Sequence, residues 1–375
     1  MILTRGARIT GAVLCAVLGV MVASWIVRDV RAAGDPLDLL RYWAGYADAR
    51  PESLPATAQS DIVLLAVYIL ATSAALRSSV AASTLVATGV VTLALRLPGV
   101  WTTGASWMDG RYSDELRTRA LLGTFVALAA GLALVVTGAA GRRASSDFYE
   151  PGPTRPGQGA AVVSFLVLGA SGAVLIAWEI RQFVTLPSAV YPDWFIGGDA
   201  VRVELTSAPP GWSSVALAVL CLVVAFTALF HAVHARPLGM IAAAFLLLSG
   251  GLGIARAVHH EMLDRFGDLG TEYQLIVLTS FFLAFAGAAG LIALSRRGFE
   301  DADGDSRGYD SYGAGGYGPP PGGGYGYPQG PGPGPAPGYG YPQAQAQPPG
   351  QGPGYGPPPG GGFGPPPPSS PPPAW

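Results

Sequence analysis

Long apolar runs alternate with short polar stretches over the first 297 residues of the chain. A spanning helix needs about 20 mostly apolar residues to cross the hydrocarbon core of a bilayer. The second run reaches that length only if its helix begins upstream, near Ala56. The pattern predicts an all-α integral membrane protein whose eight transmembrane helices contain Ile9–Val27, Ile62–Leu76, Val80–Leu97, Ala120–Thr137, Ala160–Trp178, Val215–Val233, Leu238–Ala255 and Leu275–Leu294.

The first run follows Arg5 and Arg8, as the apolar part of a signal peptide would. Its length exceeds the 7 to 15 residues typical of such a peptide, so we interpret it as a retained signal anchor. Cys15 follows Leu14, where a lipoprotein cleavage site would have a small residue. A lipid anchor at this cysteine is therefore not expected.

The two halves of the apolar region repeat one another. Each reads helix, long loop, helix, very short connection, helix, medium loop, helix. The short connections are expected at Arg77–Ser79 and His234–Pro237. Polar and aromatic residues recur at a nearly constant separation along the chain, and the matched pairs are Trp25 with Trp178, Arg28 with Arg181, Trp43 with Trp194, Asp48 with Asp199, Arg50 with Arg202, Glu52 with Glu204, Met108 with Met262, Arg111 with Arg265, and Asp114 with Asp268.

Four helices per half is an even number, so each half enters and leaves on the same side. The halves are therefore predicted to be parallel repeats, related by an axis along the membrane normal. The expected organisation is a first four-helix module over 1–143, a linker over 144–159, a second four-helix module over 160–297 and a tail over 298–375.

Composition limits the possible functions. Half of the residues are hydrophobic, only 12% are charged, and the net charge is −2. Such a balance provides no basic surface for nucleic acid. Both cysteines, Cys15 and Cys221, fall inside apolar runs, which excludes a disulfide framework and a cysteine-based zinc site.

Orientation depends on the arginines, because the chain has no lysine. Their numbers on the two sides are nearly equal, so the positive-inside count alone does not decide. Arg5 and Arg8 precede the first helix, which usually dominates insertion. We therefore expect a multi-pass protein of the plasma membrane with both termini in the cytoplasm and the longer loops outside.

The duplicated loop residues are the best candidates for a site. An arginine fork beside carboxylates and tryptophan could build a pocket for a carboxylate or phosphate on the outer face. The alternative is structural, with interfacial anchors and loop ion pairs that join Asp48 to Arg50 or Arg28 and Asp114 to Arg111 or Arg96. The candidates are Arg28, Arg181, Trp43, Trp194, Asp48, Asp199, Arg50, Arg202, Glu52, Glu204, Arg96, Arg256, Arg111, Arg265, Asp114 and Asp268.

Arg96 and Arg256 close the third helix of each half. Arginine at a helix end usually extends to the membrane interface, and the alternative is a place between helices that holds a lipid headgroup. No charged residue falls in the middle of an apolar run, which weighs against an ion-coupled pump or a voltage-gated channel.

Histidine offers little support for a metal site. His231 and His234 are expected on one side of the membrane, whereas His259 and His260 are expected on the other with Glu261 and Asp264. Adjacent histidines point to different faces of a helix, so we predict no metal and no cofactor. Nor is there a catalytic motif. Asp29 is the first candidate for an acid or base if the protein were a membrane glycosyl transferase, but its counterpart is Gln182.

From Gly298 the composition changes to glycine, proline, tyrosine and glutamine. The tail repeats GYGYPQ at 324–329 and 338–343, and GYGPPPGGG at 316–324 and 354–362. A segment with so few aliphatic side chains is expected to be disordered, with polyproline II character. It is either a multivalent ligand for cytosolic proteins or an inert solvating tail.

The eight helices, the lysine-free composition and the PPGGGYGYPQ-type tail together resemble multi-spanning integral membrane proteins of high-GC Gram-positive, actinobacterial type with Gly/Pro/Tyr-rich C-terminal tails. This resemblance implies no activity. The leading hypothesis is a non-enzymatic membrane scaffold or envelope-associated component that contacts lipids and recruits a cytosolic partner through its tail. The alternative is a transporter or a lipid-binding or small-molecule-binding protein whose site lies between the two repeats near the outer face.

Overall fold

The computed structural model describes residues 2–46, 54–143, 154–296 and 299–300. Within these ranges, eight helices are long and apolar enough to cross a membrane. The prediction of eight long apolar helices is therefore confirmed. They are α1 (Arg5–Ala33), α3 (Gln59–Arg77), α4 (Ala81–Arg96) as continued by α5 to Thr102, α6 (Asp114–Ala140), α7 (Gln158–Thr185), α9 (Pro210–Leu229), α10 (Ala235–His259) and α11 (Thr271–Ser295).

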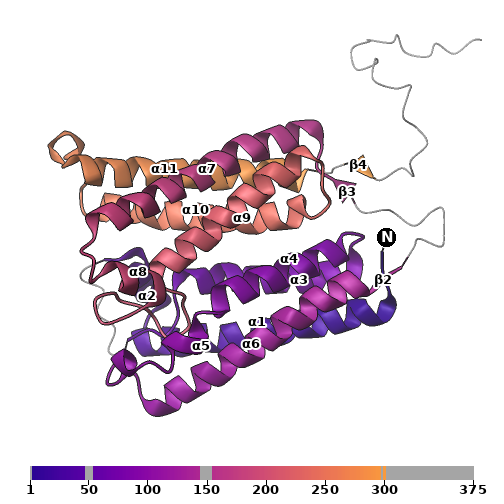
Figure 1. Ribbon diagram of the computed structural model, residues 1–375, viewed down its shortest axis with the longest axis horizontal. Helices are drawn as coiled ribbons and strands as arrows, with labels where there is room; N and C mark the ends of the chain where they lie inside the picture. The colour runs from indigo at the N-terminus through magenta and orange to yellow at the C-terminus, as the bar shows by residue number, and fades with distance from the viewer. Residues whose placement is uncertain (1, 47–53, 144–153, 297–298, 301–375) are drawn as a thin grey trace, which may run out of the picture. The chain divides into compact units, whose positions relative to one another are not determined.

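Short elements join these helices. One end of the helix bundle, here called the loop end, carries α2 (Pro36–Ala44), α5 (Gly99–Thr102), η1 (Ser106–Met108), α8 (Tyr191–Ile196) and η2 (Phe266–Asp268) (Figure 1). The opposite end, the strand end, carries four two-residue strands, β1 (Ile2–Leu3), β2 (Arg142–Arg143), β3 (Thr154–Arg155) and β4 (Phe299–Glu300). β1 pairs antiparallel with β2, and β3 with β4, so each pairing joins the start of one four-helix half to its end.

Helix ends follow local sequence signals. Thr4 and Ser113 precede α1 and α6, and their hydroxyls accept hydrogen bonds from backbone N–H groups of the first turn. Gly34 and Gly45 end α1 and α2 with φ values of 82° and 79°, a conformation that glycine adopts without steric cost. The sixth long helix begins and ends earlier than its predicted apolar run, because α9 starts at Pro210 and stops at Leu229. The second short connection is therefore 230–234, and the expected connection at His234–Pro237 is wrong because α10 begins at Ala235.

The long helices pack in the same order in both halves. In the first half α1 packs on α3 and α4 packs on α6, and in the second half α7 packs on α9 and α10 packs on α11. Contacts between the halves run through α10, which touches α2, α3 and α4, and through α9, which touches α4. The described helices therefore belong to one compact unit.

Small residues fill the helix interfaces. A Cβ atom on Gly287 of α11 would lie 2.4 Å from the backbone nitrogen of Leu247 in α10, and one on Gly250 would lie 2.3 Å from that of Ala284. Glycine at these positions lets the backbones of α10 and α11 approach closely. Large apolar side chains instead lie exposed on the helix surfaces, including Val20, Leu132, Phe226 and Phe285.

Candidate functional site

A buried carboxylate lies at the loop end of the first helix in each half. Asp29 of α1 is fully buried and accepts hydrogen bonds from the backbone N–H and hydroxyl of Thr57, at 2.7 and 2.5 Å. The indole of Trp43 donates to the carbonyl of the same threonine, at 2.8 Å. In the second half, the indole of Trp194 donates to Glu179 of α7 at 3.1 Å. Both loop tryptophans therefore hold their loops against the end of the preceding long helix.

Arg96 lies inside the protein rather than at its surface. Its side chain is only 7% exposed, and its guanidinium donates to Asp61 of α3 at 2.5 Å and to the carbonyl of Thr206. The interface position expected of an arginine at a helix end is therefore wrong for Arg96. The physical reason is that Asp61, in the first turn of α3, pairs with the guanidinium. This ion pair offsets the cost of removing the positive charge from water.

Thr206 joins this ion pair to the second half of the chain. Its hydroxyl donates to Asp61 at 3.0 Å, and its backbone N–H donates to the carbonyl of Ala56 at 2.9 Å. We call Asp61, Arg96 and Thr206 the interface network. Because Thr206 belongs to the α8–α9 loop, this network fastens a loop of the second half to the start of α3 in the first half.

Arg256, the counterpart of Arg96, has different surroundings. Its side chain is exposed, and it borders a pocket of about 400 Å³ between α10 and α11 that His260 and Tyr273 also line. Tyr46 from the α2 end stacks on His259 with ring centroids 3.8 Å apart. The two arginines at equivalent sequence positions therefore have different roles in packing.

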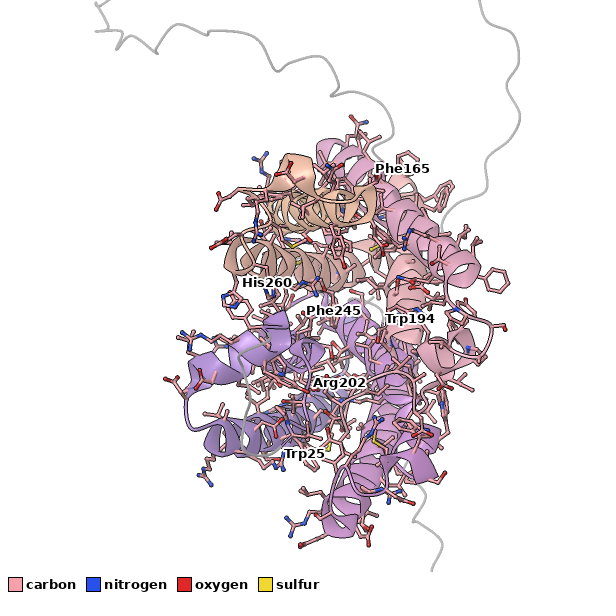
Figure 2. The ribbon with its side chains drawn as sticks, turned by 90° about the vertical axis from the view of Figure 1, so that its left-hand side faces the viewer. Trp25, Phe165, Trp194, Arg202, Phe245 and His260 are labelled. Atoms are coloured by element: carbon pink, nitrogen blue, oxygen red, sulfur yellow. The ribbon has the colours of Figure 1, made fainter. Side chains whose placement is uncertain are left out.

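Four of the predicted candidates meet in a pocket at the loop end, here called the polar pocket. Arg111, Asp199, Arg202 and Glu204 line it together with Tyr42 and Tyr112, and its volume is about 380 Å³. In Figure 2, which faces the loop end, Arg202 lies over the first-half helices although it belongs to the second half. The polar pocket therefore combines residues from both halves, with two guanidinium groups and two phenols around the half-buried acid Glu204.

Partial removal from water raises the pKa values of three side chains that line the polar pocket. Removal from water raises the pKa of the Glu204 carboxyl, and the hydroxyl of Ser207, which donates to it at 3.0 Å, opposes this effect only in part. Burial likewise raises the pKa of the phenols of Tyr42 and Tyr112 above their ordinary value. Both tyrosines are therefore neutral hydrogen-bond donors at neutral pH, and the hydroxyl of Tyr112 donates to the carbonyl of Pro55 at 2.8 Å.

The remaining candidates are dispersed. Arg28 pairs with Asp29 at 2.6 Å, and Arg181 pairs with Glu272 at 2.7 Å. Asp114 is almost fully exposed and pairs with Arg117 at 3.5 Å, so the expected contacts of Asp114 with Arg111 or Arg96 are wrong.

Of the last five candidate residues, the structure describes two. Arg265 pairs with Glu261 at 3.3 Å, and Asp268 is exposed in η2. Asp48, Arg50 and Glu52, with the pairs predicted for them, lie outside the described residues.

A second space, here called the apolar cavity, lies deeper between the two halves. Its volume is about 600 Å³, and α4 contributes Val91 and Leu95 while α9 contributes Leu217 and Leu220. Phe245 of α10 also lines it, from the region where the two sets of helices meet (Figure 2). Most of the other lining residues are apolar too, and the neutral polar ones are Gln59, Ser60, Ser213, Ser214 and Ser249.

The interface network lies between these two spaces along the α8–α9 loop. Glu204 lines the polar pocket, Thr206 belongs to the network, and Ala208 lines the apolar cavity. The lining between the halves therefore changes from polar to apolar within a few residues. A binding site for an amphipathic molecule has a lining of this kind.

Sequence reasoning missed three of the residues that organise this region, namely Asp61, Glu179 and Thr206. The available signal was position, since Asp61 directly precedes an apolar run and Glu179 directly follows one. An acid next to a spanning run will be buried when the helix continues beyond that run, as α7 does to Thr185. Nothing in the sequence around Thr206 marks its partners, because they lie about 150 residues away.

Metal ligands do not gather in the part of the chain that the structure describes, where no three His, Cys, Asp or Glu side chains form a group that could hold an ion. Cys15 and Cys221 are both buried free thiols. Comparison of the chain with protein-family models, with curated proteins and with solved structures finds no match. The function must therefore be argued from the site itself.

Proposed function

We propose that this chain is an integral protein of the plasma membrane, built from two parallel four-helix repeats with both termini in the cytoplasm. The common packing order of the helices and the recurring tryptophan anchors support the repeat. Apolar side chains on the outer helix surfaces suit contact with lipid. Arg5 and Arg8 at the start of α1 support the orientation, which would put the loop end outside the cell.

We further propose that the protein binds an amphipathic, lipid-like molecule between its two halves. The observation that carries this proposal is the apolar cavity, whose walls come from α3 and α4 of the first half and from α7, α9, α10 and α11 of the second. Its volume lies in the range of about 300 to 1,000 Å³ typical of small-molecule sites. Its walls are mainly hydrocarbon, so the bound part of the ligand is an acyl or similarly apolar chain.

Native mass spectrometry of the full-length protein, extracted with its surrounding lipid, tests this function. We expect the wild type to retain an apolar molecule, and Leu217→Trp to lose it because the larger side chain projects into the cavity and obstructs it. Leu132→Trp is the matched control, since Leu132 is 57% exposed on α6 and does not line the cavity. Equal retention by all three forms would rule out the cavity as the binding site.

A scaffold function for the tail is a second proposal, supported by its duplicated GYGYPQ and GYGPPPGGG segments. Repeated short motifs favour multivalent capture of a partner with aromatic-lined grooves. The test compares cytosolic proteins recovered with the full-length chain and with a chain ending at Arg297. An unchanged set of bound proteins would remove this proposal and leave the binding proposal intact.

A further inference from the structure

Glu179 is a buried acid without a cation partner among the residues that the structure describes. Its side chain is 8% exposed. Its carboxylate accepts a hydrogen bond from a neutral group, the indole of Trp194, at 3.1 Å, and the side chain of Ser214 lies near it. A carboxylate removed from water is costly unless a cation neutralises it, and neutral neighbours meet that requirement only in part.

The first half of the chain shows the neutralised form of the same arrangement. There the buried carboxylate, Asp29, pairs with its neighbour Arg28 at 2.6 Å. The counterpart of that arginine, Arg181, lies two residues after Glu179 but pairs with Glu272 of α11 at 2.7 Å and stacks on the ring of Trp178. The second half therefore directs its arginine away from the buried acid.

Glu179 lies directly behind the wall of the apolar cavity. Ser214, which lies near the carboxylate, lines the cavity, and so does Leu175, one helical turn before Glu179 on α7. The side chains that line the cavity are uncharged. Glu179 is thus an acid next to a space that otherwise offers hydrocarbon and a few neutral polar groups.

We propose that Glu179 recognises a positively charged head on the molecule that the cavity takes, so that the ligand class is a lipophilic cation such as an amphipathic amine or a quaternary ammonium compound. This inference rests on the proposed function, because it needs the cavity to be occupied. A cation beside Ser214 neutralises the carboxylate at short range in a dry environment, where the attraction is strongest. The hydrocarbon walls hold the apolar part of the same molecule.

Two ions of the same shape and opposite charge test the inference. Tetraphenylphosphonium and tetraphenylborate are offered separately to the full-length protein in phosphatidylcholine nanodiscs, and binding is measured by equilibrium dialysis against empty discs. We expect the wild type to bind the phosphonium and not the borate. We expect Glu179→Gln to weaken phosphonium binding by at least about tenfold, since one desolvated charge partner is lost. The comparison of the two ions in the wild type requires no variant.

Two further variants complete the design. Leu217→Trp, which obstructs the cavity and leaves Glu179 in place, should also lose the phosphonium. Glu115→Gln is the matched control, because Glu115 is 73% exposed and pairs with Arg119 at the surface, and it should bind as the wild type does.

The outcomes separate this inference from the function on which it rests. Equal phosphonium affinity of the wild type and Glu179→Gln, or equal binding of both ions by the wild type, would overturn the role of Glu179. If the wild type binds neither ion but retains a neutral lipid that Leu217→Trp displaces, the inference fails and the binding function stands. If it binds neither ion and retains no apolar molecule, both proposals fail.

Discussion

Replacement of Arg96 by leucine is the sharpest test of how the two halves are held together. The guanidinium pairs with Asp61 and donates to the carbonyl of Thr206, and the side chain is 7% exposed. In Arg96→Leu, the carboxylate of Asp61 still accepts hydrogen bonds from the backbone N–H of Ala58 and from the hydroxyl of Thr206, each at 3.0 Å. It no longer has a cation partner. Breaking a buried pair in this way costs about 3–5 kcal/mol of unfolding free energy, because an uncompensated charge stays buried.

The assay is the free energy of unfolding, measured by titration with a denaturing detergent in lipid–detergent micelles. Arg119→Leu provides the control, since Arg119 pairs with Glu115 at the surface with side chains 65% and 73% exposed. Loss of such an exposed i,i+4 pair costs about 0.3–0.5 kcal/mol. The double variant Asp61→Asn with Arg96→Leu removes the buried charge together with its partner, so we expect it to recover more than half of the loss.

A loss below about 1 kcal/mol in Arg96→Leu would refute this reasoning, because the charge of Asp61 would then be solvated by other means. An equal loss in Arg119→Leu would refute it as well. In that case removal of any arginine would be responsible, and burial would not decide the cost.

Three other predictions concern separate parts of the molecule. Burial raises the pKa of Glu204 above its ordinary value of 4.5, so the folded state holds this proton more tightly than the unfolded state does and the free energy of unfolding should rise as pH falls through the raised pKa. Unfolding titrations at several pH values should show this rise in the wild type and a smaller one in Glu204→Gln, and equal pH dependence would count against the burial of the acid. Gly287→Ala should destabilise the protein by about 1–3 kcal/mol because the new Cβ meets the backbone of Leu247, whereas Gly251→Ala, with no atom nearby, should not; melting temperatures of the two variants decide this. Tyr112→Phe should cost about 1 kcal/mol by the same titration through loss of the bond to Pro55, and an unchanged stability would mean that this bond contributes nothing net.

Hydrophobic patterning predicts much of this fold. Each of the eight long helices contains most of an apolar run that the sequence displays, because spanning length and hydrogen bonding within the helix leave few alternatives for such a run. The error at 230–233 has a simple cause. These residues continue the apolar pattern, but the chain turns there with a positive φ at His231, so composition alone does not show where α9 ends.

The candidate site was less predictable. The repeat drew attention to Arg111, Asp199, Arg202 and Glu204, and the structure brings these four together around one pocket. It does so by crossing the halves, so that residues of the first half meet non-equivalent residues of the second. A comparison of matched positions cannot foresee contacts of that kind, because sequence periodicity carries no information on how two repeats dock.

Asp29 illustrates the difference between an apparent chemical role and a packing role. As the acid just after the first apolar run, it looked like a catalytic candidate, yet its carboxylate is fully buried and its oxygens accept bonds from Thr57 and Arg28. Those partners fix the chain after α2 to the end of α1. Burial and hydrogen bonding of this kind become visible only once the loop between the helices is placed.

The bonds from Thr206 to Ala56 and Asp61 also have a consequence for biosynthesis. A ribosome releases the start of α3 about 150 residues before it makes the threonine that completes the hydrogen bonding there. Through that interval the newly made first half lacks its Thr206 contacts, and the carbonyl that Arg96 uses does not yet exist. The final arrangement of the N-terminal helices is therefore reached only after the α8–α9 loop has been translated, which makes assembly of this protein a late event in its synthesis.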